Sequence, residues 1–422
     1  MKVTLINTSD SGGGAPAASL RLLKALASEN VDAGFLVQTK KTTGANVKAV
    51  QKSFFDRLRA KINFLYERLP FIFFYERDKS VRFAFSTANA GASIVNDPMI
   101  LDADILHLHW VNSGFLSIAN LKELVKLGKP MVVTLHDMWY FTGGCHYAGT
   151  CDHFTRQCGD CYFLKKPAVA DISHEGWLRK EDLYAYANNI TFVTCSNWLE
   201  GVARQSALLK KFQIRTIPNP IDIDVYSPGD KRKARLKWNI NPEAKIILFG
   251  AANISDRRKG IDYLFEGLQY LRDQYPESAA VEVVIFGKNK QFDVTKLPFP
   301  VYELNVITAQ QDLAEIYGLA DVFVLPSIED NLPNTAMESL SCGTPVVAFN
   351  TGGLPDLIDH QQNGYLADFK SASDLAKGMY EMLYSARSEE ISSNARAKVL
   401  NTFTNKKVAQ QYIEVYQSIL KK

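Results

Sequence analysis

The chain has 422 residues, of which 46% are hydrophobic and 22% are charged, and its formal net charge is +3. This length suits two or three globular domains, and so small a net charge gives no reason to expect nucleic acid as a partner. A strand pattern begins directly after Met1, where a signal peptide would stand, and no apolar run reaches the roughly 20 residues of a membrane span. We therefore expect a cytoplasmic protein.

The first predicted elements are a buried strand over residues 3–8, a glycine-rich turn and a helix over residues 17–28. Gly13 and Gly14 lie in the turn, where the absence of a side chain lets the backbone approach a ligand closely. The turn lacks the G-x-G-x-x-G pattern of a dinucleotide site, and tight packing explains it equally well. A second strand over residues 34–38 completes the first predicted βαβ unit.

The segment over residues 52–85 alternates basic and aromatic side chains. A basic, aromatic and amphipathic stretch can lie on an anionic membrane surface. A helical pair that packs its aromatic rings into the domain and leaves its charges in water shows the same pattern. The sequence leaves both interpretations open.

Two later strands end in histidine. The predicted strand over residues 104–110 contains His107 and His109, which point to the same face because they are two residues apart. The predicted strand over residues 130–137 ends in His136 and Asp137. A lone histidine is usually structural, but three at the ends of two strands favour a site, since strand ends carry ligands in open α/β sheets.

A cysteine-rich loop follows the second of these strands. Cys145, Cys151, Cys158 and Cys161 have the spacing C-x5-C-x6-C-x2-C. The last pair forms a typical knuckle for tetrahedral zinc, and four thiolates would close the site around a structural ion. In a reducing compartment such a cluster favours a metal over four unrelated thiols. We therefore expect one structural zinc ion and no catalytic metal here.

A second series of strands and helices begins after residues 214–230, a segment with three prolines and no helical period. Strands over residues 245–251 and 281–287 flank a helix over residues 261–275. This alternation predicts a second doubly wound sheet.

Basic residues crowd the first strand-to-helix loop of this second half. Arg257, Arg258 and Lys259 stand in succession there. Their cationic groups would neutralise a pyrophosphate and stabilise it as a leaving group. A solvated basic turn is the alternative, and the position after a strand favours a site.

The most informative stretch covers residues 326–353. It predicts the end of a buried strand, a short helix that begins at Pro333 and a second buried strand over residues 345–349. The N-terminus of this helix faces the carboxyl end of a strand, where unpaired amides and the helix dipole favour an anion.

Polar side chains surround this helix start. Around the predicted start of the helix lie Asp330, Asn331, Leu332 and Asn334. Glu338 lies one turn beyond Asn334, on the same face of the helix. Carboxylates repel phosphate but accept hydrogen bonds from sugar hydroxyls. The pattern therefore indicates a ligand with both groups, as a nucleotide-activated sugar has.

The order P-S-x-x-[acid]-x7-E-[small]-x-x-x-G-x-P-V-V-A, closed by a Gly-Gly pair, resembles the donor-site signature of glycosyltransferase family 4. Members of that family are retaining sugar transferases of the GT-B fold, with two Rossmann-like domains that face a cleft. Asp330 stands where the family usually has Glu, and Asn331-Leu332-Pro333 replaces its usual Gly-Phe-Gly. Together with the segment LHDMWYFTGGCHY, this variant resembles a branch that builds colanic-acid-like and other bacterial surface polysaccharides.

The resemblance implies an α/β fold with an N-terminal Rossmann-like acceptor domain over residues 1–216, which carries the cysteine-rich loop 141–166. It implies a C-terminal Rossmann-like nucleotide-sugar domain over residues 217–403. It further implies that a helix over residues 404–422 packs back on the first domain.

The resemblance also implies roles for single residues. His136 matches the family's histidine near the reacting carbon of the donor sugar, and Lys259 matches the lysine that holds the diphosphate. The family's arginine after the preceding strand is missing, and Arg258 would compensate for it. The implied catalytic residues are His136, Asp330 and Lys259, and the implied donor-binding residues are Gly13, Gly14, Arg258, Lys259, Asn331, Leu332, Asn334 and Glu338.

We therefore expect a retaining glycosyltransferase that moves a sugar from a nucleotide sugar to a glycan or lipid-linked glycan in bacterial surface polysaccharide synthesis. Catalysis would need no cofactor, because cations and backbone amides would stabilise the leaving group. A lipid-linked acceptor would bring the protein to the inner membrane face as a peripheral protein. Two alternatives are a nucleotide-sugar epimerase or hydrolase of the same fold, and a non-catalytic, zinc-bearing protein that binds sugar nucleotides.

Overall fold

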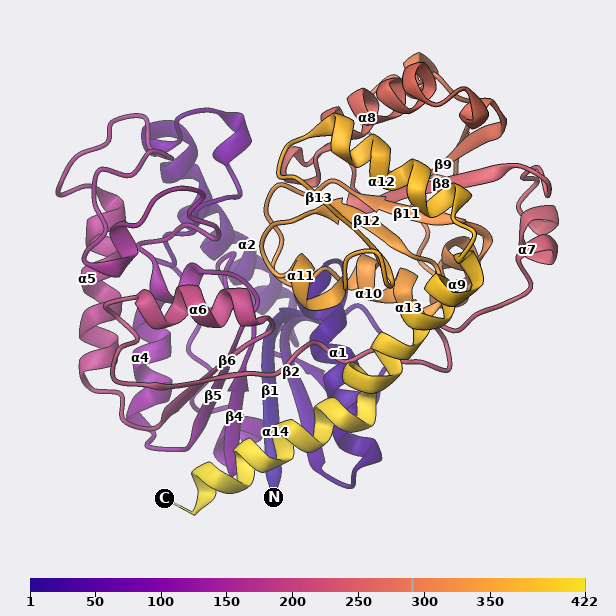
Figure 1. Ribbon diagram of the computed structural model, residues 1–422. Helices are drawn as coiled ribbons and strands as arrows, with labels where there is room; N and C mark the ends of the chain where they lie inside the picture. Colours follow the sequence, from indigo (N-terminus) through magenta and orange to yellow (C-terminus); the bar gives the residue numbers. More distant parts are fainter. Residues whose placement is uncertain (290–291, 422) are drawn as a thin grey trace. The chain divides into compact units, whose positions relative to one another are not determined.

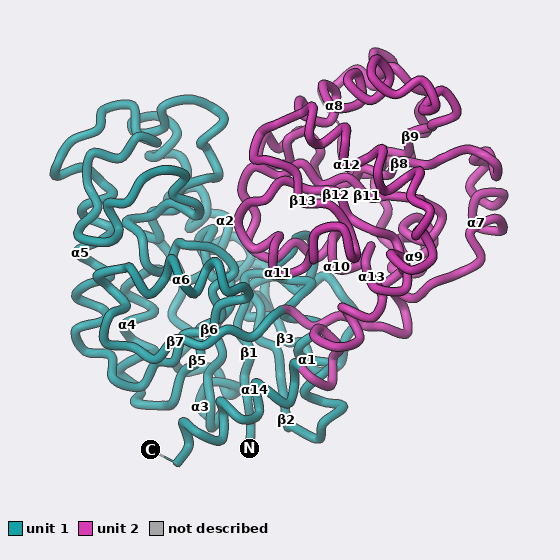
Figure 2. The backbone as a smooth tube through the Cα atoms, in the orientation of Figure 1, with its two compact units in different colours: residues 1–218, 408–422 teal, residues 219–407 magenta. Residues whose placement is uncertain are grey.

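The computed structural model describes residues 1–289 and 292–421, and the chain divides into two compact units (Figure 2). Unit 1 consists of residues 1–218 and 408–422. Unit 2 consists of residues 219–407. Lys422, the last residue of the predicted C-terminal helix, lies outside the described residues.

Unit 1 is built on a parallel sheet that has seven strands in the described part of the chain, in the order β3-β2-β1-β4-β5-β6-β7 (Figure 1). Strands covered on both faces need apolar side chains on both, and β5 and β6 are buried along their whole length. The strands are β1 (Lys2–Ser9), β2 (Asp32–Thr39), β3 (Val47–Ala49), β4 (Ile105–Leu108), β5 (Met131–Leu135), β6 (Ile190–Thr194) and β7 (Gln213–Thr216).

Helices cover both faces of this sheet. On one face, α1 (Gly14–Ser28) and α14 (Asn405–Leu420) bury leucine, valine and tyrosine side chains against β1 and β2. Tyr416 of α14 lies 2.7 Å from His107 Nδ1 through its hydroxyl, so the end of the chain supports strand β4. The other face carries α4 (Ile118–Lys126), α5 (Ile172–Ala185) and α6 (Asn197–Gln205).

A helical excursion between β3 and β4 contains the basic and aromatic segment. It consists of α2 (Phe54–Pro70), a π-helical turn (Phe71–Tyr75) and the short α3 (Pro98–Leu101). The rings of Phe71 and Phe85 are buried and stack with their centroids 5.3 Å apart. Many other rings are exposed, so the interpretation in which the aromatics pack into the domain holds for Phe71 and Phe85 and is wrong for the exposed ones.

Unit 2 repeats the design with six parallel strands among the described residues, in the order β10-β9-β8-β11-β12-β13. The strands are β8 (Lys245–Asn253), β9 (Val281–Lys288), β10 (Val301–Glu303), β11 (Val322–Leu325), β12 (Val346–Phe349) and β13 (Gly364–Ala367). The helices are α7 (Lys231–Lys237), α8 (Ile261–Gln274), α9 (Gln310–Leu319), α10 (Asn334–Ser341), α11 (Leu354–Leu357), α12 (Ala372–Tyr384) and α13 (Ser388–Thr402). Helices α8 and α12 pack on one face, and α9 and α10 lie on the other (Figure 1).

Both strand orders are those of a doubly wound sheet, which confirms the predicted fold class. The direction of winding reverses between β1 and β4 in unit 1, and between β8 and β11 in unit 2. In such sheets ligands bind outside the carboxyl ends of the strands at these reversals. None of the helices in the described residues is long and apolar enough to cross a membrane.

Candidate functional site

The glycine-rich turn follows β1, at the point where the winding of the unit 1 sheet reverses. Helix α1 begins at Gly14, earlier than predicted, so Gly13 is its N-cap and Gly14 its first residue. Gly12 has φ +91°, a left-handed conformation that favours glycine, and all three glycines are exposed. An open helix N-terminus of this kind suits an anionic group.

Three histidines form a row at the carboxyl ends of β4 and β5, in which His107 and His109 are buried and His136 is half-buried. His109 Nδ1 lies 3.0 Å from His136 Nε2, and His136 Nδ1 lies 3.7 Å from the sulfur of Cys195. Burial lowers the pKa of His107 to about 3 and the pKa of His136 to about 4. Burial also lowers the pKa of His109, so all three imidazoles are neutral near neutral pH.

Asp137, directly after His136, is held by three donors. Its carboxylate accepts hydrogen bonds from His146 Nδ1 at 2.7 Å, from the Trp139 amide at 2.8 Å and from Trp110 Nε1 at 3.2 Å. Burial opposes ionisation of Asp137, but His146 and these hydrogen bonds outweigh it, and the net pKa is lowered. The carboxylate therefore stays charged and orients the loop that carries His136.

A chain of hydrogen bonds extends from Asp137 to α2. Ser86 Oγ lies 2.9 Å from His146 Nε2 and accepts a hydrogen bond from Arg68 Nη2 at 3.0 Å. His146 thus links the two ends of this chain through its ring nitrogens, with Nδ1 at the Asp137 carboxylate and Nε2 at the Ser86 hydroxyl. His146 therefore positions Asp137.

In unit 2 an ion pair joins two predicted catalytic residues. Lys259 Nζ lies 2.6 Å from Asp330 Oδ2, and Ser327 Oγ donates to the same oxygen at 3.2 Å. Lys259 follows β8 and Asp330 follows β11, so the pair spans the reversal of the sheet. The arrangement places a cation and a carboxylate where a ligand of this fold is expected.

Close backbone packing holds the two loops of this pair together. Gly260 has φ +69°, and a Cβ there would lie 1.8 Å from the carbonyl oxygen of Pro326. The Ile328 amide donates to the Arg258 carbonyl at 2.8 Å. The Gly-Gly pair after β12 serves the same purpose, since a Cβ on Gly352 would lie 2.1 Å from the Asp330 carbonyl oxygen.

Helix α10 starts beside the ion pair. Pro333 is its N-cap and Asn334 its first residue, and among the described residues no side chain caps its first turn. The side chains of Asn331 and Leu332 are buried, so these two positions offer backbone rather than side chains to a ligand. Sequence reasoning missed Asn219, whose Nδ2 lies 3.5 Å from the Leu332 carbonyl oxygen and supports this turn.

Glu338 lies one turn into α10 and is 7% exposed. Its Oε2 accepts a hydrogen bond from the Tyr317 hydroxyl at 3.0 Å. Burial, followed by the charge of Glu338, raises the pKa of Tyr317 well above its ordinary value, so the hydroxyl stays a donor. Tyr317 is a supporting residue that sequence reasoning missed, because nothing in the pattern of α9 distinguishes it from a core aromatic.

Arg258 lies beside the ion pair but has a partner of its own. Its Nη2 lies 2.7 Å from Asp256 Oδ2, and its side chain is 40% exposed. Asp256 also caps the short 3-10 turn (Arg257–Lys259) by accepting from the Arg258 amide. The structure thus places Arg258 near the site and Lys259 directly in it.

The cysteine-rich loop contains free thiols in the described residues. Burial raises the pKa of Cys158 to about 11 and the pKa of Cys161 to about 12. In the part of the chain that the structure describes, no group of three or more histidine, cysteine or acidic side chains is arranged to hold a metal ion. The zinc site therefore stays a prediction.

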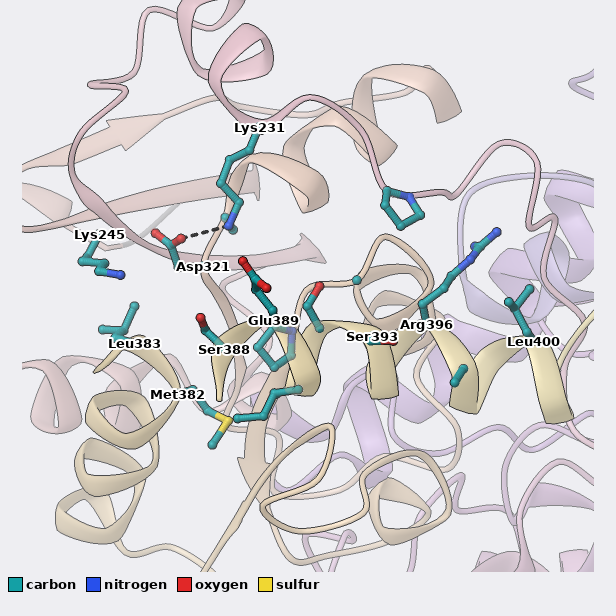
Figure 3. A pocket seen from close by; sticks show the side chains of 17 residues that line it. Lys231, Lys245, Asp321, Met382, Leu383, Ser388, Glu389, Ser393, Arg396 and Leu400 are labelled. Atoms are coloured by element: carbon teal, nitrogen blue, oxygen red, sulfur yellow. Dashed lines mark hydrogen bonds and ion pairs between the residues drawn. The ribbon is translucent and has the colours of Figure 1, made fainter. Parts of the chain in front are cut away.

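A cavity of about 620 Å³ lies elsewhere in unit 2 (Figure 3). Its lining includes Lys245 and Asp321, which stand at the amino ends of β8 and β11, and Lys231, which pairs with Asp321 at 2.9 Å. Parallel strands carry their ligands at the opposite, carboxyl end. This cavity is therefore not the candidate site.

Known proteins share this architecture. Sucrose-phosphate synthase from Thermosynechococcus elongatus aligns with a TM-score of 0.65 at 18% identity, over 99% of this chain and 98% of that one. HepE from Anabaena, solved in complex with UDP-glucose, aligns with a TM-score of 0.63 at 17% identity, over 99% of this chain and 100% of that one. Two doubly wound units of this kind, with their polar residues at the sheet reversals, define a GT-B protein.

The family follows from the sequence. Residues 12–225, about half of the chain, match the model of Glycosyltransferase Family 4, and residues 230–398 match that of Glycosyl transferases group 1. The chain belongs to glycosyltransferase family 4. The D-inositol 3-phosphate glycosyltransferase of Pseudarthrobacter chlorophenolicus is 28% identical over 289 residues, which cover 67% of this chain and 62% of that relative.

Proposed function

We propose that this chain is a retaining glycosyltransferase that uses a nucleoside diphosphate sugar. The observation that carries the proposal is the ion pair of Lys259 and Asp330 beside the start of α10. A donor of this class has an anionic diphosphate and a sugar rich in hydroxyls, and this place offers a cation, backbone amides and a carboxylate together. The complex of HepE with UDP-glucose supports a UDP-sugar as the first donor to test.

Each of the candidate site residues in unit 2 has a distinct role in this proposal. Lys259 and the amides at the start of α10 hold the diphosphate and stabilise the charge that develops as the bond to the sugar breaks. Asp330 keeps Lys259 in place before the donor binds and then accepts hydrogen bonds from sugar hydroxyls. Glu338, with one oxygen held by Tyr317, accepts hydrogen bonds from the ribose. No cofactor is required for these steps.

We assign His136 to the sugar that is transferred. The transition state of glycosyl transfer carries positive charge at the reacting carbon, as in glycoside hydrolysis. A protonated imidazole would oppose that charge, whereas burial keeps His136 neutral. Asp137, held by three donors, fixes the loop that presents it.

We further propose that the acceptor is a glycan or lipid-linked glycan of bacterial surface polysaccharide synthesis. The support is the Asp330 variant of the donor signature together with the segment over residues 135–147. The similar D-inositol 3-phosphate glycosyltransferase takes its name from a phosphorylated polyol. An acceptor screen should therefore contain both small polyols and lipid-linked glycans.

A matched pair of lysine variants tests the donor site. Lys259→Ala removes the lysine of the Lys259–Asp330 pair, and Lys231→Ala removes the lysine of the Lys231–Asp321 pair at the other end of the same sheet. Loss of one group that stabilises a developing charge costs roughly 10²–10³ in turnover, so Lys259→Ala should lose that much transfer. Lys231→Ala should keep wild-type transfer. Equal turnover in both variants would show that the diphosphate is held elsewhere.

Product analysis separates the alternatives. An epimerase or hydrolase converts or cleaves the sugar nucleotide without an acceptor, whereas a transferase needs one for full turnover. A non-catalytic binding protein shifts its melting temperature with a sugar nucleotide and gives no product with any acceptor.

A further inference from the structure

We propose that α2 and the π-helical turn after it form a docking surface for an anionic lipid bilayer. The apolar part of this surface, the aromatic face, consists of Phe54, Phe55, Leu58, Ile62, Leu65, Tyr66, Leu69, Phe73 and Phe74. The inference rests on the exposure, orientation and charge of these residues and is independent of the transfer reaction.

The exposure of the aromatic face is unusual for a soluble surface. Phe55, Phe73 and Phe74 are 77%, 70% and 72% exposed. With Phe54 and Tyr66, these rings expose on the order of 600 Å² at the 150–250 Å² typical of an aromatic side chain. The largest apolar patch of an ordinary monomer is roughly 300–600 Å² and is often functional. Five rings alone reach that limit.

The aromatic face is a continuous stripe along α2. At about 100° per residue, its seven members on α2 fall within about 120° of the helix circumference. Arg57 and Lys61 lie along one edge of the stripe and Arg59 along the other. This is the distribution of an interfacial helix that lies in the plane of the headgroups.

The buried side of α2 is polar and fixes the orientation of the helix. The buried residues of α2 are Glu67 and Arg68. Glu67 Oε2 accepts from the Gly114 amide at 2.6 Å, and Arg68 Nη1 donates to the Phe85 carbonyl at 2.7 Å. A Cβ on Gly114 would lie 2.5 Å from the Phe64 amide, so the helix backbone rests directly on this loop. Polar and backbone contacts thus hold α2 with its apolar side outward.

The charged side chains of α2 indicate which partner fits this surface. The exposed charged side chains of α2 are Arg57, Arg59 and Lys61, while Asp56 is used in a capping box with Ser53. Basic side chains at the edges of an apolar stripe complement anionic headgroups. In a symmetric contact between two copies the same side chains would face each other and repel. A bilayer therefore fits this surface better than a second copy of the chain.

Flotation of the full chain with vesicles tests the proposal. The wild type should float with vesicles of phosphatidylcholine mixed with phosphatidylglycerol. A smaller fraction of it should float with vesicles of pure phosphatidylcholine. Replacing Arg57, Arg59 and Lys61 with Gln should lower partitioning on the order of 100-fold at low ionic strength, since each contributes about 1 kcal/mol near an anionic surface. Replacing Phe55, Phe73 and Phe74 with Ser should abolish flotation with both lipids. The matched control removes three exposed lysines of unit 2: Lys288→Gln, Lys296→Gln and Lys377→Gln.

Each outcome decides the proposal. Loss of flotation in the α2 variants but not in the control, with unchanged melting temperatures, supports it. A wild type that stays down with both vesicle types overturns it. Equal flotation of the wild type and the α2 variants also overturns it. If the wild type does not float but forms a concentration-dependent dimer, and the phenylalanine variant stays monomeric, the surface binds a second copy of the chain instead of a bilayer.

Discussion

His109 Nδ1 lies 3.0 Å from His136 Nε2, and this contact assigns the protons of both rings. His109 Nε2 is buried and, among the described residues, has no hydrogen-bond partner. Buried N–H groups without an acceptor are rarer than unpaired acceptors, so the proton of His109 belongs on Nδ1. His109 then donates to His136 Nε2, and His136 carries its own proton on Nδ1. His136 is therefore a hydrogen-bond donor at its remaining nitrogen.

The buried histidines predict a loss of stability in mild acid. Burial holds the pKa of His107 at about 3 and that of His136 at about 4, below the ordinary value of 6.5. In this pH range the unfolded chain therefore binds more protons than the folded chain does. The free energy of unfolding falls as the pH drops from about 6.5 towards 4. Each histidine contributes up to roughly 1.4 kcal/mol per pH unit within this window. Thermal unfolding across this range measures the slope.

A variant within the row provides the control for this slope. His136→Gln removes one histidine whose pKa is lowered by burial, so its stability should fall less steeply with pH than that of the wild type. A melting temperature that stays constant between about pH 7 and pH 5 would contradict the neutral, buried row.

The Lys259–Asp330 pair predicts opposite effects of its two members on nucleotide affinity. Asp330→Asn removes the carboxylate that holds Lys259 and repels phosphate, so UDP should bind more tightly, by about 3- to 10-fold. Lys259→Ala should weaken UDP binding by a similar factor. Both variants should transfer sugar more slowly, because one loses a contact to the sugar and the other a contact to the leaving group.

Calorimetric titration with UDP measures the affinities. Weaker binding of UDP by Asp330→Asn would mean that this carboxylate contributes to the nucleotide site directly. Both variants should keep the apo protein folded, because the two side chains of the pair still reach solvent, at 23% and 13% exposure.

The fold could be predicted from the sequence because its strands are buried apolar runs with glycine and proline between them. Strand β8 was expected over residues 245–251 and extends over Lys245–Asn253, and α10 begins one residue after the expected position. Strand β13 was missed, because its four residues begin with glycine and carry a short apolar signal.

The candidate site could be predicted less completely. Position after a strand predicted Lys259 and Asp330, which the structure brings into contact, and the helical turn beyond Asn334 predicted Glu338. Their partners lie far away in the sequence: Tyr317 holds Glu338, and His146 holds Asp137. Such pairings arise from the path of the chain, which periodicity does not encode. The same holds for α2, whose amphipathic pattern is clear but whose buried side is the polar one.

The cysteine-rich loop predicts a measurable metal content. The spacing of Cys145, Cys151, Cys158 and Cys161 leads us to expect one zinc atom per chain after purification without a chelator. Bound zinc would protect these thiols from alkylation until a chelator is added, whereas Cys195, outside the loop, would not change. Protein that contains no zinc and reacts at all four positions would remove the zinc prediction.

Two glycine variants test how tightly the loops of the donor site are packed. Gly260 has φ +69°, and a Cβ would meet the Pro326 carbonyl oxygen at 1.8 Å. Gly260→Ala should therefore cost about 2–4 kcal/mol, since it adds left-handed strain to a clash with backbone. Gly201 lies in the exposed interior of α6 with open space around it, so Gly201→Ala should stabilise by about 0.5–1 kcal/mol.

Urea unfolding of the two variants gives opposite signs if the packing is as described. Gly260→Ala should also slow sugar transfer, because the shift of either loop separates Lys259 from Asp330. Gly201→Ala should leave transfer unchanged. If Gly260→Ala were as stable and as active as the wild type, the loop after β8 would have room to move, and the close contact of the two loops could not be what positions the lysine.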